Sequence, residues 1–213
     1  HKWDSTAGNL LLSIVVRPNV NPAKYSGLAA VCGLAVLETL EKQGLATEIG
    51  LKWPNDLVAR GRKLGGILVE AARDNEGKPF AVCGIGVNVS YTPSEVPDGG
   101  LPAIGLSDLN ENVPSVDTLL DEVYHTVMDA VDAWAEQLNT LAEDANPLAP
   151  IHDEYVARLN WIDERVIARS PAGDELARGI FKTVDDFGRA SIETDNGLRS
   201  FQYEEASLRP LNG

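Results

Sequence analysis

The feature that most constrains the fold is the stretch from residue 48 to residue 90, where four strand-length apolar segments alternate with turn signals. The turns fall at Gly61 and at residues 73–79. Short strands joined by tight turns form hairpins. The predicted strands are Glu48–Trp53, Leu57–Ala59, Lys63–Ala72 and Phe80–Ser90.

A further strand and a helix precede these hairpins. The segment Asn9–Arg17 is rich in Leu, Val and Ile and is followed by Pro18, as expected of a mostly buried strand. Asn21 is suited to cap a helix that continues to Gly44 with apolar residues at helical spacing. We therefore predict a mixed sheet with hairpins and a helix lying on it.

Two more helices are predicted in the second half of the chain. Between Val116 and Leu141, apolar residues recur every three or four positions and Asp and Glu fill the other face, which is typical of one amphipathic helix. A shorter helix is predicted at His152–Leu159. Residues 91–114 are rich in Pro, Gly, Asp and Asn, and predict a long loop with one helical turn near Leu106.

From Arg165 onward the pattern changes to short strands broken by three hairpin signals, Ser-Pro-Ala-Gly-Asp-Glu, Asp-Asp-Phe-Gly-Arg-Ala and Thr-Asp-Asn-Gly. This pattern predicts a small all-β unit of about five strands. We place a boundary near Asp163, which divides the chain into residues 1–162 and 163–213. The whole chain is predicted to be α+β.

Length and composition limit the class of protein. A chain of 213 residues with 44% hydrophobic residues can bury a substantial core. The apolar run Leu10–Val16, interrupted only by Ser13, has strand length and is too short to span a membrane. Cys32 and Cys83 lie in apolar segments and are expected to be buried thiols, so we expect a soluble protein of the reducing cytoplasm. The chain begins at His1, and we expect that it has lost its natural beginning.

Charge is distributed unevenly along the chain. Residues 1–90 hold 10 Lys and Arg against 8 Asp and Glu, whereas residues 91–213 hold 8 against 24. A ligand rich in phosphate is therefore expected to bind the first half. The net charge of −14 disfavours duplex nucleic acid as a partner, because such binding requires a basic face.

Polar residues interrupt the hairpin segment 51–70 where a strand core would be apolar. Lys52 precedes a strand end at Pro54, so its ammonium group is expected at the end of the sheet, where ligand sites of such folds lie. Asn55 and Asp56 follow, and an amide and a carboxylate there suit a hydrated Mg²⁺ beside phosphates. The alternative is an Asn-Asp turn whose side chains bond their own backbone.

Glycines mark the strands that follow. Gly65 and Gly66 are costly inside a strand, so they indicate either the close approach of a ligand or a β-bulge. The segment Gly84–Val89 resembles a dinucleotide fingerprint only superficially, because the third glycine and the following helix are missing. Asn88 in this segment offers both a donor and an acceptor to an adenine edge. His125 and His152 are predicted to be surface or helix-packing residues, since no ligand spacing accompanies them.

Three motifs stand in order along the chain: Lys-Trp-Pro-Asn-Asp at 52–56, Arg-Lys-Leu-Gly-Gly-Ile-Leu-Val-Glu at 62–70 and Gly-Ile-Gly-Val-Asn-Val at 84–89. Together they resemble the signatures of the biotin protein ligases. Residues 2–18 and 188–210 extend the resemblance over nearly the whole chain. It implies a ligase core related to class II synthetases, followed by a small SH3-like β-barrel.

The resemblance also implies two-step chemistry. Biotin and ATP, with Mg²⁺, would form biotinyl-5′-AMP, and a lysine of a biotin carboxyl carrier domain of acetyl-CoA carboxylase or a related carboxylase would then accept biotin. Lys52 would be the catalytic residue, contacting the biotin carboxyl and the α-phosphate. The remaining implied contacts are Lys63 with phosphate, Trp53, Asn55 and Asp56 with ATP and its metal, Gly65, Gly66 and Ile67 with biotin, Asn88 with adenine, and Trp3 with the adenylate.

Departures from the family pattern leave more than one function open. The Gly-Arg-rich loop and the Ser-Thr-Asn segment of the family would lie before His1. A DNA-binding helix-turn-helix would also lie there, and with it the chain would act as a biotin-responsive repressor as well as a ligase. The chain could also be a lipoate ligase, or a module that holds nucleotide without turnover. An exposed sheet edge is expected to pair with the carrier or with a second copy.

Overall fold

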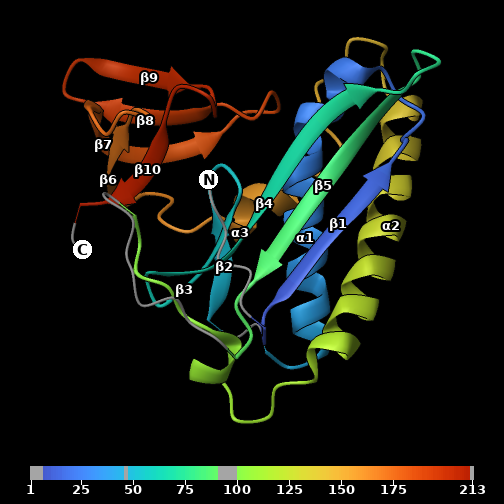
Figure 1. The fold of residues 1–213 in the computed structure, drawn as a ribbon. Helices are drawn as coiled ribbons and strands as arrows, with labels where there is room; N and C mark the ends of the chain where they lie inside the picture. Colours follow the sequence, from blue (N-terminus) through green and yellow to red (C-terminus); the bar gives the residue numbers. More distant parts are fainter. Residues whose placement is uncertain (1–6, 46–47, 91–99, 212–213) are drawn as a thin grey trace.

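The computed structural model describes residues 7–45, 48–90 and 100–211. The elements follow the order β1, η1, α1, β2–β5, η2, α2, α3 and β6–β10 (Figure 1). The strands form two separate five-stranded sheets, and the helices belong to the part of the chain that carries the first sheet. The α+β fold class is therefore confirmed.

The first sheet has the strand order β1-β5-β4-β3-β2. The hairpin region supplies four of its strands and the segment after Gly8 supplies the fifth, close to the predicted bounds. The observed strands are β1 Leu10–Val16, β2 Ile49–Lys52, β3 Asp56–Ala59, β4 Arg62–Arg73 and β5 Pro79–Val87.

The prediction that this sheet is mixed was wrong in detail. All four pairs of neighbouring strands run antiparallel. Parallel pairing among the described residues is limited to isolated bridges, Leu51 with Leu159 and Lys63 with Ala103. The helical connection does join two strands of the same direction, β1 and β2, but they lie at opposite edges of the sheet. The hairpin strands β3–β5 lie between them, so no parallel ladder forms.

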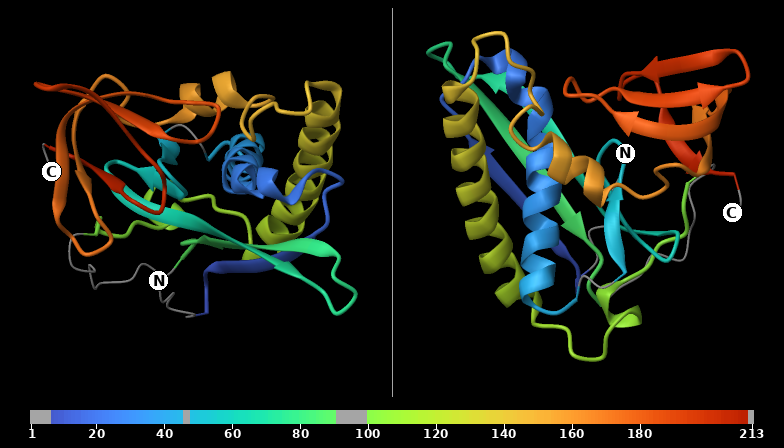
Figure 2. Two further views of the ribbon diagram at one scale, coloured as in Figure 1. Left: turned by 90° about the horizontal axis from the view of Figure 1, so that it is seen from above. Right: turned by 180° about the vertical axis from the view of Figure 1, so that it is seen from behind.

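The helices cover one face of this sheet. Asn21 caps the 3-10 helix η1, Pro22–Gly27, by accepting from the Ala23 N–H, and α1, Leu28–Lys42, follows directly. Helix α2, Val116–Thr140, packs beside α1 on the same face (Figure 2), as its apolar stripe predicts. The remaining helices are η2, Leu106–Asp108, and α3, His152–Arg158.

The segment Pro22–Lys42 is more apolar than was recognised from the sequence. By length and composition it could cross a membrane, but 72% of its most apolar window is buried in the structure. Helix α1 lies against the sheet, α2 and α3. A helix that is covered on several sides is apolar around most of its circumference. Its composition is therefore explained by its place in the core.

The second sheet has the order β10-β6-β7-β8-β9 and is antiparallel throughout. It contains the five strands predicted from the hairpin signals, and it begins two residues after the expected boundary at Asp163. The strands are β6 Arg165–Arg169, β7 Glu175–Val184, β8 Ala190–Thr194, β9 Gly197–Phe201 and β10 Ser207–Pro210.

Candidate active site

One row of residues crosses the whole first sheet, on the face opposite the helices. A Cβ on Gly33 of α1 would touch the side chains of Leu51 and Ile67. Because successive residues of a strand alternate between faces, the neighbours Lys52 and Gly66 point away from α1. Directly paired residues of antiparallel strands share a face. The cross-sheet row therefore consists of one residue from each strand, paired in register: Lys52, Asp56, Gly66, Gly86 and Leu11.

The charged end of the cross-sheet row is an ion-pair network. Lys52 Nζ lies 2.8 Å from Asp56 Oδ2, and Lys63 Nζ lies 2.6 Å from Asp56 Oδ1. The side chains of Lys52 and Asp56 are 2% and 14% exposed, whereas that of Lys63 is 32% exposed. Lys63 is thus the more accessible ammonium group, and Lys52 is the buried one.

Burial and charge shift the ionisation of this network. Burial, opposed by the Asp56 carboxylate, lowers the pKa of Lys52 to about 8. Burial raises the pKa of Asp56, but the ammonium groups of Lys52 and Lys63 outweigh it and lower the pKa overall. Each group therefore keeps its charge because the other is present.

A third cation acts on this carboxylate from the second sheet. Arg209 on β10 is partly buried, and it interacts electrostatically with both Asp56 and Lys52. Burial lowers the pKa of the Arg209 guanidinium, and the Asp56 carboxylate opposes that shift. Arg209 was not predicted from the sequence, because one arginine in a short C-terminal strand carries no pattern. The cations around Asp56 are thus Lys52, Lys63 and Arg209.

Gly66 and Gly86 belong to the cross-sheet row, and the adjacent Gly65 has a different role. A Cβ on Gly65 would lie 2.5 Å from the Gly86 carbonyl oxygen, so Gly65 allows β5 to approach closely. Gly66 and Gly86 face the other side of the sheet, where neither contributes a side chain, and both are buried. A Cβ on Gly84, on the same face, would meet its nearest neighbour at 3.6 Å. Gly66 was expected from the resemblance to contact biotin, whereas Gly86 was not singled out from the sequence as a site residue.

Asn55 and Ile67 lie at the edge of the row. The Ile67 N–H donates to the Asn55 carbonyl at 2.8 Å, and the Asn55 side-chain amide donates to the Ile67 carbonyl at 2.5 Å. The Ile67 side chain is buried towards α1. Asn55, which directly precedes β3, therefore extends the pairing of β4 by one residue before β3 begins. The predicted contacts of Asn55 with ATP and of Ile67 with biotin remain predictions.

Asn88 and Trp53 make buried contacts within the protein. Asn88 Nδ2 donates to the Ile104 carbonyl at 3.1 Å. The Trp53 indole N–H donates to the Gly188 carbonyl at 2.9 Å, which links the two sheets. Their predicted contacts with adenine and ATP remain predictions. The predicted adenylate contact, Trp3, lies outside the described residues.

The described residues do not fit a ready-made metal site. Both oxygens of Asp56, the predicted ligand, are ion paired with lysines. In the parts of the chain that the structure describes, no group of three or more His, Cys, Asp or Glu residues could hold a metal ion. Asp56 is therefore the counter-ion of the two lysines and is not assigned to Mg²⁺.

A groove of about 410 Å³ runs beside the C-terminal half of β4, from Ile67 to Ala71. Strand β3 pairs with β4 only as far as Gly66. Because Ile67 directs its N–H and C=O towards Asn55, strand alternation directs those of Val69 and Ala71 to the same edge. Both residues line the groove, together with the exposed rings of Phe187 and Tyr203 from the second sheet. The groove thus combines an open strand edge with apolar side chains.

Comparison with known proteins agrees with this geometry. Residues 1–88 match the biotin/lipoate A/B protein ligase family, and residues 162–209 match the biotin protein ligase C terminal domain. A biotin--[acetyl-CoA-carboxylase] ligase of Paracoccus denitrificans is 32% identical over 190 residues, which cover 88% of this chain and 75% of that protein. The chain belongs to the biotin protein ligase family.

A second curated relative and a solved structure are also similar to this chain. A biotin--[acetyl-CoA-carboxylase] ligase of Mycobacterium tuberculosis is 35% identical over 90% of this chain, and the chain spans 66% of that relative. The solved biotin protein ligase of Aquifex aeolicus in complex with biotin and ATP superposes with a TM-score of 0.74 at 23% identity, covering 99% of this chain and 82% of that one. The fold of this ligase-family chain is therefore confirmed.

Proposed function

We propose that the protein is a biotin protein ligase that activates biotin with ATP and transfers it to a lysine of a biotin carboxyl carrier domain. The observation that carries this proposal is the cross-sheet row, with cations at one end, glycines in the middle and Leu11 at the other end. Biotin has the matching shape, because an apolar chain joins its carboxylate to a bicyclic ring. Relatives named as biotin--[acetyl-CoA-carboxylase] ligases favour biotin over lipoate.

In the first step a biotin carboxylate oxygen attacks the α-phosphorus of ATP, the bond to the β-phosphate breaks, and pyrophosphate leaves. Both reactants are anions, so the site must supply fixed positive charge and alignment. We assign the contact with the α-phosphate and the biotin carboxyl to Lys63, the accessible cation, beside Lys52. Asp56 holds both ammonium groups in place, and Arg209 adds charge for the phosphates. Gly66 and Gly86 leave room for the biotin chain.

In the second step the neutral amine of a carrier lysine attacks the acyl carbon of biotinyl-5′-AMP. An amide forms, AMP leaves, and the amine loses a proton. We propose that the carrier docks along the open edge of β4, where the N–H and C=O groups of Val69 and Ala71 can extend the sheet. A second copy of the chain pairing at that edge is the competing outcome of the docking test.

We propose two further properties with the function. The reaction takes place in the cytoplasm, which is supported by the free and buried state of Cys32 and Cys83. Residues 1–162 form the catalytic domain and residues 163–213 form a second domain, which is supported by the separate sheets.

Biotin-dependent exchange of pyrophosphate into ATP tests the proposed function. We expect exchange with biotin, weaker exchange with lipoate, and loss of exchange in Lys63→Ala and Lys52→Ala. Lys182→Ala is the control, because Lys182 lies in the second sheet and pairs with Asp163. Equal exchange with both acids, or exchange that survives both site variants, would refute the assignment.

A further inference from the structure

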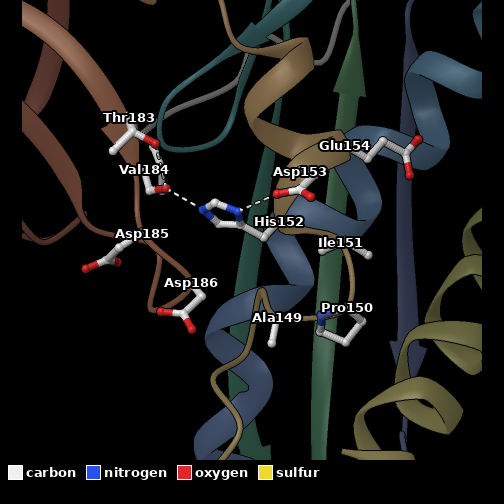
Figure 3. Close-up of a pocket in the computed structure, with 10 residues that line it drawn as sticks. All are labelled: Ala149, Pro150, Ile151, His152, Asp153, Glu154, Thr183, Val184, Asp185 and Asp186. Atoms are coloured by element: carbon white, nitrogen blue, oxygen red, sulfur yellow. Dashed lines mark hydrogen bonds and ion pairs between the residues drawn. The ribbon is translucent and has the colours of Figure 1, made fainter.

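His152, at the start of α3, has both ring nitrogens beside oxygen acceptors. Nε2 lies 2.8 Å from the Val184 carbonyl oxygen, and Nδ1 lies 3.1 Å from Asp153 Oδ1 (Figure 3). A neutral imidazole carries one N–H, so it can donate to only one of these oxygens. The geometry therefore suits the imidazolium form, which donates to both.

The charged groups around His152 favour the same form. Asp153 and Glu154 come from α3, and Asp185 and Asp186 come from the turn after β7. These residues line a hollow of about 770 Å³ together with His152 (Figure 3). Burial lowers the pKa of His152, but the bonds to Asp153 and Val184 and the nearby Asp186 outweigh it and raise the pKa overall.

His152 is one of three contacts that hold the turn between β7 and β8, residues 184–189, against the first part of the chain. The Leu148 N–H donates to the Asp186 carbonyl at 2.9 Å, and the Trp53 indole N–H donates to the Gly188 carbonyl at 2.9 Å. Within the turn, the Asp185 carboxylate accepts from the N–H groups of Phe187 and Arg189. The turn is thus stiffened internally and held at three places.

The third contact connects this turn to the charged end of the cross-sheet row. Trp53 directly follows Lys52, and its ring is buried against the turn. A displacement of the turn would therefore move Trp53 and change the orientation of Lys52 towards Asp56.

From these contacts we propose that His152 is a positioning residue for adenylation: as the imidazolium it fixes the β7–β8 turn, and through Gly188 and Trp53 it sets the orientation of Lys52. This inference rests on the proposed ligase function. Neutral His152 has a single N–H, for which the Asp153 carboxylate competes with the Val184 carbonyl. In the tautomer protonated on Nδ1 the Val184 carbonyl loses its donor, and the turn gains freedom. Adenylation is then expected to slow as pH rises through the titration of His152.

The test compares pH profiles of biotin-dependent exchange in the wild type and in His152→Ala. The ratio of the two rates isolates His152, because Lys52 titrates in both proteins. At low pH we expect a ratio of about five, the factor for one net hydrogen bond, and a severalfold decline as the imidazolium loses its proton. His152→Gln donates to Val184 without titrating, so its ratio to His152→Ala should stay constant. Asp153→Asn should move the midpoint of the decline to lower pH.

Hydrogen exchange of the Phe187 and Arg189 amides gives a second reading that needs no turnover. We expect their protection to decline over the same pH range in the wild type and to be low throughout in His152→Ala. A constant rate ratio, or a midpoint that Asp153→Asn does not move, would overturn the proposal. If biotin-dependent exchange is absent while the amide protection titrates, the proposed function fails and the role of His152 in fixing the turn stands.

Discussion

Lys52 and Asp56 face each other across the β2–β3 hairpin, paired in register and joined by an ion pair of 2.8 Å. Their neighbours Trp53, Pro54 and Asn55 form the turn between them. The ammonium group is almost completely removed from water, so its charge depends on one carboxylate. This dependence leads to three predictions about pH and stability.

The first prediction concerns the alkaline limb of activity. Because the pKa of Lys52 is lowered to about 8, the ammonium group is lost as pH rises through that value, and with it a positive charge beside the reacting phosphate. We expect biotin-dependent exchange to fall above pH about 8. Lys52→Arg stays charged and should lack this limb, because arginine does not deprotonate in proteins. If exchange falls equally in the wild type and in Lys52→Arg above this pH, the fall is caused by the titration of another group.

The second prediction is that stability changes in the opposite direction over the same range. The folded pKa of Lys52 is about 8 and its ordinary value is 10.5, so between these values the unfolded state binds more protons. The contribution of Lys52 to the free energy of unfolding therefore rises with pH in this window. We expect the wild type to gain stability relative to Lys52→Met there, measured by urea unfolding at matched pH. If the wild type instead loses stability relative to Lys52→Met as pH rises through this window, the pKa of Lys52 is not lowered in the folded state.

The third prediction concerns the loss of Asp56. In Asp56→Asn the Lys52 ammonium group remains buried without its carboxylate, a change that typically costs about 3–5 kcal/mol. We expect the free energy of unfolding to fall by roughly that amount, and the double variant Asp56→Asn, Lys52→Met to recover part of it. If the double variant is no more stable than the single one, the buried charge is not the cause.

The fourth prediction separates two glycines of the first sheet. Gly65→Ala would place a Cβ 2.5 Å from the Gly86 carbonyl oxygen, so β4 and β5 must separate. We expect a loss of about 1–3 kcal/mol, as for other overpacked positions. The matched control is Gly84→Ala, whose Cβ meets its nearest neighbour at 3.6 Å and should leave the melting temperature within a few degrees of the wild type. Equal losses would show that glycine is needed for its backbone freedom alone.

The fifth prediction concerns docking at the β4 edge. Ala71→Pro removes an N–H that faces the groove and leaves the ladder with β5 intact, because proline is tolerated on an open strand edge. We expect the KM for the carrier domain to rise about tenfold while pyrophosphate exchange stays unchanged, since one backbone hydrogen bond and its alignment are lost. Ala71→Val keeps the N–H and should behave as the wild type. Loss of self-association without a change in carrier KM would assign the edge to a second copy.

Local sequence patterns were sufficient to predict most of the fold. The hairpin strands, the Asn21 cap and the amphipathic helix α2 depend on turn residues and periodicity within one segment, and the structure places them close to the predicted bounds. The mixed sheet was predicted wrongly, because strand order depends on contacts between distant segments. Whether β1 lies beside β2 or beside β5 cannot be read from either strand alone.

The candidate site was predictable only where its residues are close in sequence. Lys52, Asp56 and Lys63 lie within one hairpin region, and the structure brings them together as an ion-pair network. Arg209 and Gly86 were missed because they reach the site from other strands. The preference for Lys52 over Lys63 came from its place before the strand end at Pro54 and from the family resemblance, whereas the difference in exposure between the two side chains is set by packing.

The cross-sheet row takes one residue from each of five strands, so its gradient from charge to apolar surface runs perpendicular to the chain. No continuous peptide of this protein contains that gradient, and a misplaced strand would interrupt it. A ligand that recognises the row therefore binds the assembled sheet and not its parts. Ligand concentration then shifts the folding equilibrium by mass action, with about 2.7 kcal/mol added at a hundredfold excess over Kd. Within a cell, the supply of such a ligand would help to set how much of the protein persists against unfolding and proteolysis.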